Sequence, residues 1–190
     1  MSKAVETYES LGRRIVTASR ITGEFKLRSG ATSGVYFDKY RFEAEPDLLS
    51  EIAARMEPLI PDGTERLIGL EMGGIPLATA LSLRSGLKLG FCRKKAKEYG
   101  TRLQVEGGVE SGEKVTVVED VITSGGAAHD AIRVLREAGC EILAILCVVD
   151  REAGAGEKFR ESNVDFRPLY KWSRLEELRG AGCKDREQET

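Results

Sequence analysis

The chain has a single histidine, four cysteines and no long apolar run. The cysteines, Cys92, Cys140, Cys147 and Cys183, form no Cys-x-x-Cys pair, so with one histidine we expect no structural zinc site. No stretch reaches the roughly 18 apolar residues of a membrane span. Charges throughout Met1–Thr17 argue against a signal peptide. We therefore expect a cytoplasmic protein that has no membrane partner.

Neither sign of charge dominates the sequence. Lysine and arginine number 29, aspartate and glutamate 31, and the net charge is −2. Such a balance lacks the overall basic character of a nucleic-acid-binding protein, so any anion site must be local. No Gly-x-Gly-x-x-Gly follows a predicted strand, which argues against a dinucleotide-binding oxidoreductase. The 190 residues, 41% hydrophobic and 32% charged, predict one soluble globular domain spanning residues 1–190.

Apolar periodicity predicts an alternation of strands and helices. We expect a helix over 4–18, a strand or hairpin arm over 35–42, helices over 46–58, 77–83 and 127–138, and strands over 66–71, 87–93, 115–119 and 142–149. This order is typical of an α/β protein with a mostly parallel sheet. Ligands bind at the carboxyl ends of such strands, so residues 71–74, the segment from Arg93, residues 119–126 and Asp150–Arg151 should meet.

The stretch from Lys114 to Gly126 combines a buried strand, an acidic pair and a small polar loop before a helix. Hydroxyls and backbone N–H groups at a helix N-terminus can hold a phosphate. Glu119 and Asp120 repel a phosphate, but they can accept hydrogen bonds from hydroxyls or attract a metal. The pattern therefore suits a phosphorylated sugar. The alternative interpretation is a solvated strand end followed by an ordinary turn.

A basic segment follows the predicted strand 87–93. Between Arg93 and Lys97, four of five residues are cationic. At this edge of the sheet, a flexible cationic loop can close over a polyphosphate and neutralise a departing pyrophosphate. Composition alone favours a solvated loop. His129, in the first turn of the helix after the polar loop, is predicted to have a surface role rather than a catalytic one.

The stretch from Lys114 to Gly126 resembles the phosphoribosyl pyrophosphate signature of the type I phosphoribosyltransferases. With Arg-Lys-x-x-Lys-x-x-Gly from Arg93 and Phe-x-Leu-x-Ser-Gly from Phe25, the chain is similar to the orotate phosphoribosyltransferases over about residues 8–175. The resemblance implies an α/β type I phosphoribosyltransferase fold, whose central, mostly parallel sheet is flanked by helices. It divides the chain into an N-terminal helix and small hood (1–45), a core (46–180) and a frayed tail (183–190).

The resemblance also implies an activity. Orotate and phosphoribosyl pyrophosphate give orotidine 5′-monophosphate and pyrophosphate, with Mg²⁺, in pyrimidine biosynthesis. It implies a homodimer whose basic loop reaches the neighbouring active site. Arg93, Lys94 and Lys97 are the implied catalytic residues and contact the pyrophosphate, Lys94 in the partner's site. Glu119 and Asp120 bind the ribose hydroxyls, and no side chain is implied as a metal ligand.

The remaining implied roles concern the phosphate and the base. Thr123–Ala127 cradle the 5′-phosphate, Arg151 binds orotate, Tyr36 and Phe37 pack on the base, and Met72–Gly73 hold pyrophosphate through backbone groups. The implied substrate-binding positions are Arg28, Tyr36, Phe37, Met72, Gly73, Glu119, Asp120, Val121, Ile122, Thr123, Ser124, Gly125, Gly126, Ala127 and Arg151.

The chain departs from the family pattern at three positions. Tyr99 stands where many members have histidine, Arg28 stands where a version of the motif has lysine, and Gly73 replaces a lysine of some members. Two alternatives remain: a phosphoribosyltransferase for a purine or uracil, and a regulator that senses phosphoribosyl pyrophosphate and binds DNA. The basic segment and Arg151 argue against the first, and the net charge of −2 argues against the second.

Overall fold

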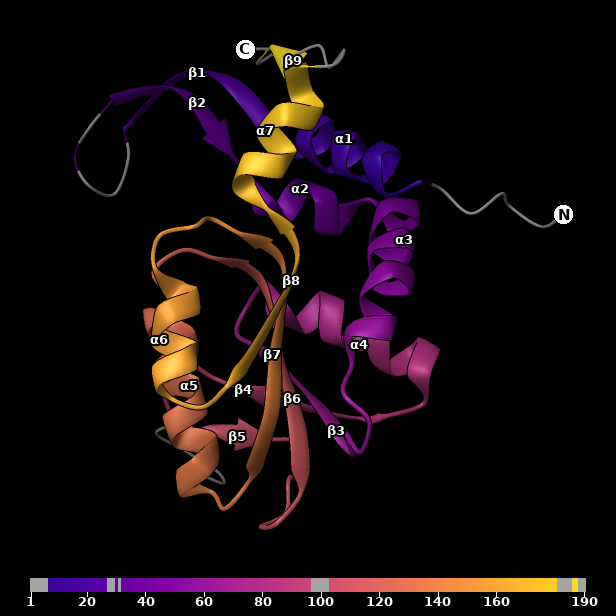
Figure 1. The fold of residues 1–190 in the computed structure, drawn as a ribbon, viewed down its shortest axis with the longest axis vertical. Coiled ribbons are helices and arrows are strands. Elements are labelled where there is room, and N and C mark those ends of the chain that lie inside the picture. Colours follow the sequence, from indigo (N-terminus) through magenta and orange to yellow (C-terminus); the bar gives the residue numbers. More distant parts are fainter. Residues whose placement is uncertain (1–6, 27–29, 31, 97–102, 181–185, 188–190) are drawn as a thin grey trace, which may run out of the picture.

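The computed structural model describes residues 7–26, 30, 32–96, 103–180 and 186–187 of the chain. The predicted site residues Arg28 and Lys97, together with Tyr99, lie outside these ranges. Two sheets are present, a six-stranded sheet in the order β5-β4-β3-β6-β7-β8 and a three-stranded sheet in the order β2-β1-β9. In Figure 1 the small sheet lies above one end of the large one, with helices around both.

The large sheet forms the core of the molecule. Its parallel strands are β3 (Arg66–Leu70), β4 (Lys88–Cys92), β6 (Lys114–Ile122), β7 (Glu141–Asp150) and β8 (Asp165–Lys171), and β5 (Val105–Glu106) is antiparallel at the edge. Val115, Val117 and Val118 of central strand β6 are wholly buried. Apolar side chains on both faces suit a strand that is covered on both sides. The predicted mostly parallel sheet is confirmed.

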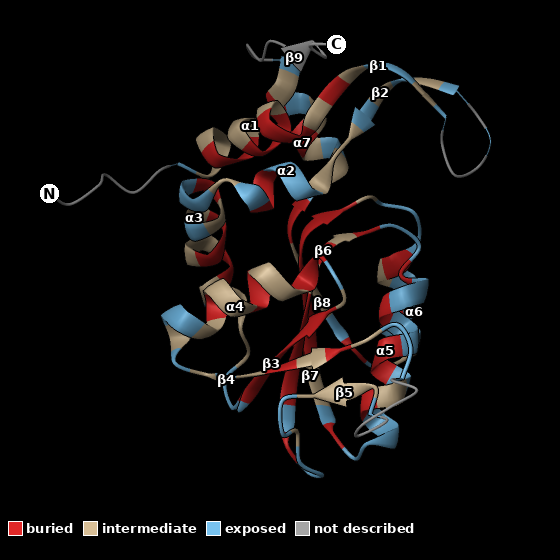
Figure 2. Ribbon diagram, turned by 180° about the vertical axis from the view of Figure 1, so that it is seen from behind, coloured by how far each residue is buried: buried red, intermediate tan, exposed pale blue. Residues whose placement is uncertain are grey.

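Helices cover both faces of this sheet. On one face lie α3 (Pro46–Met56), the 3₁₀ turn η1 (Glu57–Leu59) and α4 (Gly74–Ser85), and on the other lie α5 (Gly126–Glu137) and α6 (Ala155–Glu161). Each face has its own apolar cluster, around Leu77 and Leu81 on the α4 side and around Ile132 and Phe159 on the α5 side. In Figure 2 the buried strands lie between these two layers.

Two predicted boundaries were wrong. The acidic pair does not end its strand, because β6 continues past Glu119 and Asp120, and its pairing with β7 reaches Ile122. The predicted strand over 35–42 is divided, since β2 (Thr32–Phe37) is followed by helix α2 (Lys39–Ala44). Asp38 ends the strand because its side chain accepts a hydrogen bond from the Tyr40 N–H (3.2 Å) and caps the new helix.

The hood contains both ends of the described chain. It is formed by α1 (Tyr8–Ser19), β1 (Arg20–Lys26), β2 and α2, joined by α7 (Trp172–Gly180), which packs against α1 (Figure 1). The hydroxyl of Tyr8 donates to the Leu169 carbonyl (2.7 Å), and the hydroxyl of Tyr170 donates to the Tyr8 carbonyl (2.6 Å). The predicted hood of residues 1–45 was therefore incomplete.

The predicted frayed tail also contains a paired segment. Strand β9 (Arg186–Glu187) pairs in parallel with β1 at Ile21 and Thr22. The backbone groups at this edge of β1 supply the hydrogen bonds that fix it. The rest of residues 183–190 lies outside the described ranges.

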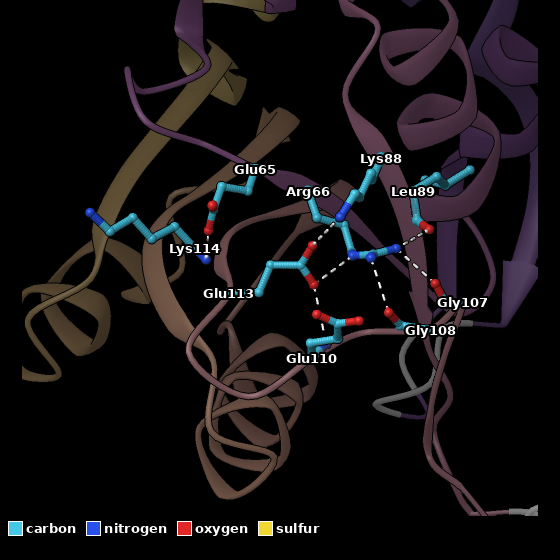
Figure 3. Close-up of polar contacts among 9 residues, drawn as sticks. All are labelled: Glu65, Arg66, Lys88, Leu89, Gly107, Gly108, Glu110, Glu113 and Lys114. Carbon is cyan, nitrogen blue, oxygen red and sulfur yellow. Dashed lines mark hydrogen bonds and ion pairs between the residues drawn. The ribbon is translucent and has the colours of Figure 1, made fainter.

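A buried arginine network lies at the amino ends of the strands, away from the edge that faces the hood (Figure 3). The Arg66 guanidinium donates to Glu113 (2.9 Å) and to the carbonyls of Leu89 (3.0 Å), Gly107 (2.7 Å) and Gly108 (3.0 Å). The hydrogen bond from Arg66 lowers the pKa of Glu113. One side chain thus holds the backbone that follows β5 against the main sheet.

Candidate active site

A cleft of about 660 Å³ lies between the hood and the carboxyl ends of the strands. Its lining includes eight predicted site residues, namely Tyr36, Met72, Arg93, Lys94, Glu119, Val121, Thr123 and Ala127. It also includes Glu71, which begins the predicted segment 71–74, and Lys39, Tyr40, Leu70, Cys92, Gln104, Asp130 and Ala131, which were not predicted as site residues. Three of the four strand ends predicted to meet line this cleft, whereas Asp150 and Arg151 do not.

The small polar loop forms a second hollow, of about 180 Å³, at the start of α5. Its lining comprises Glu119, Val121, Ile122, Thr123, Ser124, Gly125, Gly126, Ala127 and Ala128. Gly125 caps the helix with a φ of 73°, a left-handed conformation that glycine adopts without steric cost. No described side chain caps this end, so the first N–H groups of α5 are left for another acceptor. An anion such as a phosphate fits there.

Asp120 is wholly buried where β6 meets the hood. The Lys39 ammonium donates to Oδ1 (3.0 Å) and lies 2.7 Å from Oδ2, and the Val121 N–H also donates to Oδ1 (2.5 Å). A Cβ added at Gly73 would lie 1.6 Å from Oδ2. The carboxylate of Asp120 thus fills the space that a side chain at residue 73 would take in this structure.

Two further carboxyls lie close to this ion pair. Burial, followed by the charge of Asp120, raises the pKa of Glu43 on α2 to about 8. Burial and the neighbouring Asp120 also raise the pKa of Glu119 well above its ordinary value. Burial alone lowers the pKa of Lys39, but the hydrogen bond and charge of Asp120 outweigh it, so the net shift is upward. Lys39 therefore stays cationic, while Glu43 is mostly protonated at neutral pH.

The basic segment is held at its base. The Gln104 side chain donates to the carbonyls of Arg93 (2.9 Å) and Lys94 (3.3 Å), and the Arg93 N–H donates back to the Gln104 carbonyl (2.9 Å). The Lys94 N–H donates to the Glu71 carboxylate (3.0 Å). Arg93 and Lys94 therefore start from a fixed position on the cleft wall.

Arg151 and Phe37 lie outside the cleft lining. The guanidinium of Arg151 stacks on the Trp172 ring, 3.8 Å from the ring centroid, and Phe37 meets the same ring edge-on at 5.1 Å. Burial lowers the pKa of Arg151 from its ordinary value, and the charge of Glu176 acts in the opposite direction. The Arg151 N–H donates to the Ile122 carbonyl (2.8 Å), which keeps this residue beside the polar loop.

Sequence reasoning missed Lys39, Gln104 and Trp172. One signal was present for Lys39, because Lys39 and Glu43 are four residues apart and share one face of a helix. Gln104 and Trp172 act through contacts that arise only on folding. The predicted surface role of His129 agrees with its ring nitrogen lying 2.8 Å from the Ser162 hydroxyl on the exterior.

No group of three or more histidine, cysteine, aspartate or glutamate side chains in the described ranges could hold a metal ion. No helix of the described chain has both the length and the apolar character needed to cross a membrane.

Known proteins share this sequence and fold. A phosphoribosyl transferase domain matches residues 45–170. The orotate phosphoribosyltransferase of Nocardioides sp. is 45% identical over 174 residues, which cover 92% of this chain and 97% of that protein. The enzyme of Methanocella arvoryzae is 48% identical over 153 residues, covering 80% and 87% of the two chains.

A solved structure agrees with these relatives. The orotate phosphoribosyltransferase of Mycobacterium tuberculosis H37Rv, crystallised with Fe(III) dicitrate, superposes with a TM-score of 0.81 at 29% identity, covering 88% of this chain and 98% of that one. The parallel sheet, the polar loop at the start of α5 and the sequence identity over most of the chain lead to one conclusion. The chain belongs to the phosphoribosyl transferase family and, within it, to the orotate phosphoribosyltransferases.

Proposed function

We propose that this protein transfers the 5-phosphoribosyl group from phosphoribosyl pyrophosphate to orotate, giving orotidine 5′-monophosphate and pyrophosphate in pyrimidine biosynthesis. One observation carries the proposal. A polar loop at an open helix end, the carboxylate Glu119 with its buried neighbour Asp120 behind it, and the two cations Arg93 and Lys94 lie together at the carboxyl edge of the sheet. A sugar that carries a phosphate at one end and a pyrophosphate at the other needs these three kinds of group.

We assign the groups by their chemistry. The loop Thr123–Ala127 would hold the 5′-phosphate through its N–H groups and hydroxyls. Glu119 and Asp120 would accept hydrogen bonds from the ribose hydroxyls. The backbone of Met72–Gly73 and the side chains of Arg93 and Lys94 would bind pyrophosphate. Arg93 suits a bidentate clamp and Lys94 a movable point charge.

The reaction breaks the bond between ribose C1′ and a pyrophosphate oxygen. Positive charge develops on the sugar while negative charge grows on the leaving group. Fixed groups on the two sides can stabilise both changes, since carboxylates lie toward the sugar and cations toward the pyrophosphate. Orotate is already an anion and needs no strong general base. Catalysis would then depend mainly on positioning of the two substrates and on electrostatic stabilisation of the transition state.

The base would lie near the hood. Tyr36 lines the cleft and is 45% exposed, so its ring is available for contact with a planar pyrimidine. The Arg151 guanidinium offers several N–H donors for the carboxylate and carbonyl groups of orotate. Stacking on the Trp172 ring holds this guanidinium in one orientation. Phe37 would act indirectly, by packing against Trp172.

Mg²⁺ is proposed to arrive with phosphoribosyl pyrophosphate as part of the substrate complex. Among the described residues the carboxylates form no cluster of three ligands, and Asp120 is already paired with Lys39, which supports binding of the ion mainly through the substrate. A magnesium ion that is bound mainly by substrate phosphates needs few protein ligands.

The assembly and the location are also proposals. A homodimer that shares the basic segment between subunits would follow the family pattern. A cytoplasmic location is supported by the free state of the described cysteines Cys92, Cys140 and Cys147, which is typical of a reducing compartment.

The experiment that tests the activity measures consumption of orotate by the purified protein with phosphoribosyl pyrophosphate and Mg²⁺. Parallel reactions contain uracil, hypoxanthine or adenine in place of orotate. We expect turnover of orotate only. Turnover of another base would retain the phosphoribosyl site and remove the role assigned to Arg151, and binding without turnover of any base would contradict the proposed activity.

A further inference from the structure

Gln104 joins the start of the basic segment to the strand that follows it. Its side-chain amide donates to the carbonyls of Arg93 (2.9 Å) and Lys94 (3.3 Å), and its own carbonyl accepts from the Arg93 N–H (2.9 Å). This pairing continues the antiparallel ladder of β4 and β5, in which Cys92 lies opposite Val105. Gln104 therefore lies opposite Arg93, where the chain leaves one strand and returns to the next.

The backbone of Arg93 and Lys94 has a partner at each of its N–H and carbonyl groups. Gln104 binds both carbonyls and the Arg93 N–H, while the Glu71 carboxylate accepts from the Lys94 N–H (3.0 Å). The Glu71 N–H in turn donates to the Cys92 carbonyl (2.9 Å), so β4 also fixes Glu71. The directions in which the two cationic side chains leave the backbone are therefore set before a ligand binds.

Gln104 itself stands on a rigid support. Strand β5 follows it directly, and the Arg66 guanidinium binds the carbonyls of Gly107 (2.7 Å) and Gly108 (3.0 Å) just beyond that strand. Arg66 is buried and paired with the buried Glu113 carboxylate (2.9 Å). The main sheet thus holds the amide donor in place, and the donor holds the basic segment.

The side chains of Arg93, Lys94 and Gln104 all line the cleft. A group that must be ordered when a ligand binds lowers the affinity, whereas a group that is already in position does not. A glutamine suits residue 104 for a second reason, because its NH₂ group can bind two carbonyl oxygens without bringing a negative charge to an anion site. Loss of this amide should therefore weaken binding at the two cations in particular.

We propose that Gln104 is a positioning residue for the pyrophosphate end of phosphoribosyl pyrophosphate, acting by holding the backbone from which Arg93 and Lys94 project. The inference rests on the pyrophosphate-binding role proposed above for these two cations. Its effect is confined to ligands that carry a pyrophosphate group, whichever subunit's site the Lys94 ammonium enters. A glutamine that served stability alone would affect all ligands alike.

The test measures binding of phosphoribosyl pyrophosphate, inorganic pyrophosphate and ribose 5-phosphate by titration calorimetry, with Mg²⁺ and without orotate. Gln104→Met removes the amide, and Gln104→Asn withdraws it from the two carbonyls because the side chain is shorter. Leu103→Met is the matched control at a neighbouring side chain that is 51% exposed. We expect both Gln104 variants to bind the two pyrophosphate ligands at least fivefold more weakly, with ribose 5-phosphate within twofold of wild type. Leu103→Met should match wild type for all three ligands.

A combined variant separates positioning from direct contact with the ligand. In a background that carries both Arg93→Met and Lys94→Met, Gln104→Met should cause no further loss of phosphoribosyl pyrophosphate affinity, because Gln104 acts through these two residues. Full additivity would overturn the inference, as would an equal loss of ribose 5-phosphate binding or wild-type affinities in folded Gln104→Asn. Wild-type protein that binds phosphoribosyl pyrophosphate without turnover of orotate would contradict the proposed function and leave this inference standing.

Discussion

At the scale of single residues, the tightest constraint in the site is the contact between Gly73 and Asp120. The two residues are far apart in sequence, yet the carboxylate occupies the position that a Cβ at residue 73 would take. The turn before α4 and the end of β6 therefore fit together as one surface. A substitution in either segment should therefore shift the backbone or side chains of the other.

Gly73→Ala should lower activity without unfolding the protein. The new methyl group would displace the Asp120 carboxylate from Lys39, so we expect the KM for phosphoribosyl pyrophosphate to rise at least tenfold. Steady-state kinetics measure this change, and circular dichroism checks the fold. Gly156→Ala is the matched control, since its Cβ would meet only the Phe166 ring at 3.8 Å. Equal kinetics for Gly73→Ala and wild type would contradict the contact.

Glu43 should make stability depend on pH. Its pKa is raised from the ordinary 4.5 to about 8, so the folded state binds this proton more tightly than the unfolded state does. The stabilisation is full below pH 4.5 and is lost as the pH rises through about 8. Glu43→Gln should therefore be more stable than wild type at pH 8.5, by on the order of 1 kcal/mol after solvent screening.

Urea unfolding at pH 5, 7 and 8.5 measures this difference. The advantage of Glu43→Gln over wild type should grow with pH, whereas the surface variant Glu137→Gln should follow the wild-type curve. Parallel curves for Glu43→Gln and wild type would show that the Glu43 carboxyl ionises as readily in the folded state as in the unfolded one.

The sequence revealed those parts of the site that are contiguous in the chain. The loop Thr123–Ala127 and the pair Glu119–Asp120 could be predicted because strand, carboxylates and helix start follow one another directly. Lys39 could not be paired with Asp120 in this way, since 81 residues separate them and no local pattern records the contact. The stacking of Arg151 on Trp172 depends on the docking of α7 and escaped prediction for the same reason.

At the scale of secondary structure, the Arg66 network fixes how the basic segment returns to the sheet. Strand β5 and the turn at Gly107–Gly108 follow that segment, and Arg66 binds both glycine carbonyls. The same guanidinium pairs with buried Glu113, which precedes β6. Three neighbouring parts of the sheet are thus joined by one side chain.

Arg66→Met should destabilise the fold by about 3–5 kcal/mol, because it leaves the Glu113 carboxylate buried without its partner. Arg66→Lys should recover only part of this loss, since an ammonium cannot reproduce the planar fork. The free energy of unfolding in urea measures both effects. Combining Arg66→Met with Glu113→Leu should return part of the stability. A double variant as unstable as Arg66→Met would contradict the role of the unpaired charge.

Local patterns predicted the elements of the core better than those of the hood. Strands β3 and β7 are largely apolar and β6 has the β-branched run Val115–Val118, and such runs identify buried parallel strands. The hood strands β1 and β2 are mostly exposed or half-buried and carry no such signal. The end of β2 was misplaced because Asp38 begins a helix within a run of aromatic and charged residues that also suits a strand.

At the scale of the whole molecule, the proposed dimer makes a prediction about mixed subunits. If Lys94 acts in the partner's site, Lys94→Ala and Asp120→Asn homodimers should both be nearly inactive. In a mixed dimer one site would receive an intact Asp120 from one subunit and an intact Lys94 from the other. Co-expressed subunits carrying two different affinity tags allow purification of this species.

The mixed dimer should regain about half of the wild-type turnover, because only one of its two sites is complete. A dimer of two wild-type subunits carrying the same tags sets the reference value. No recovery in a stable mixed dimer would mean that Lys94 serves its own subunit, and a monomeric wild-type protein would contradict the shared site altogether.

The hydrogen bonds that join Tyr8 to Leu169 and Tyr170 affect how the protein can fold during synthesis. Helix α1 packs against α2 and α3, which follow it closely in the chain, and against β8 and α7, which are synthesised much later. The segments β3 to β7 lie between them and can assemble earlier. The apolar face of α1, with Leu11 and Ile15, therefore stays only partly covered until β8 and α7 have been synthesised. A nascent chain of this protein would present the uncovered part of that face to chaperones, and its hood would be complete only after α7 has been synthesised.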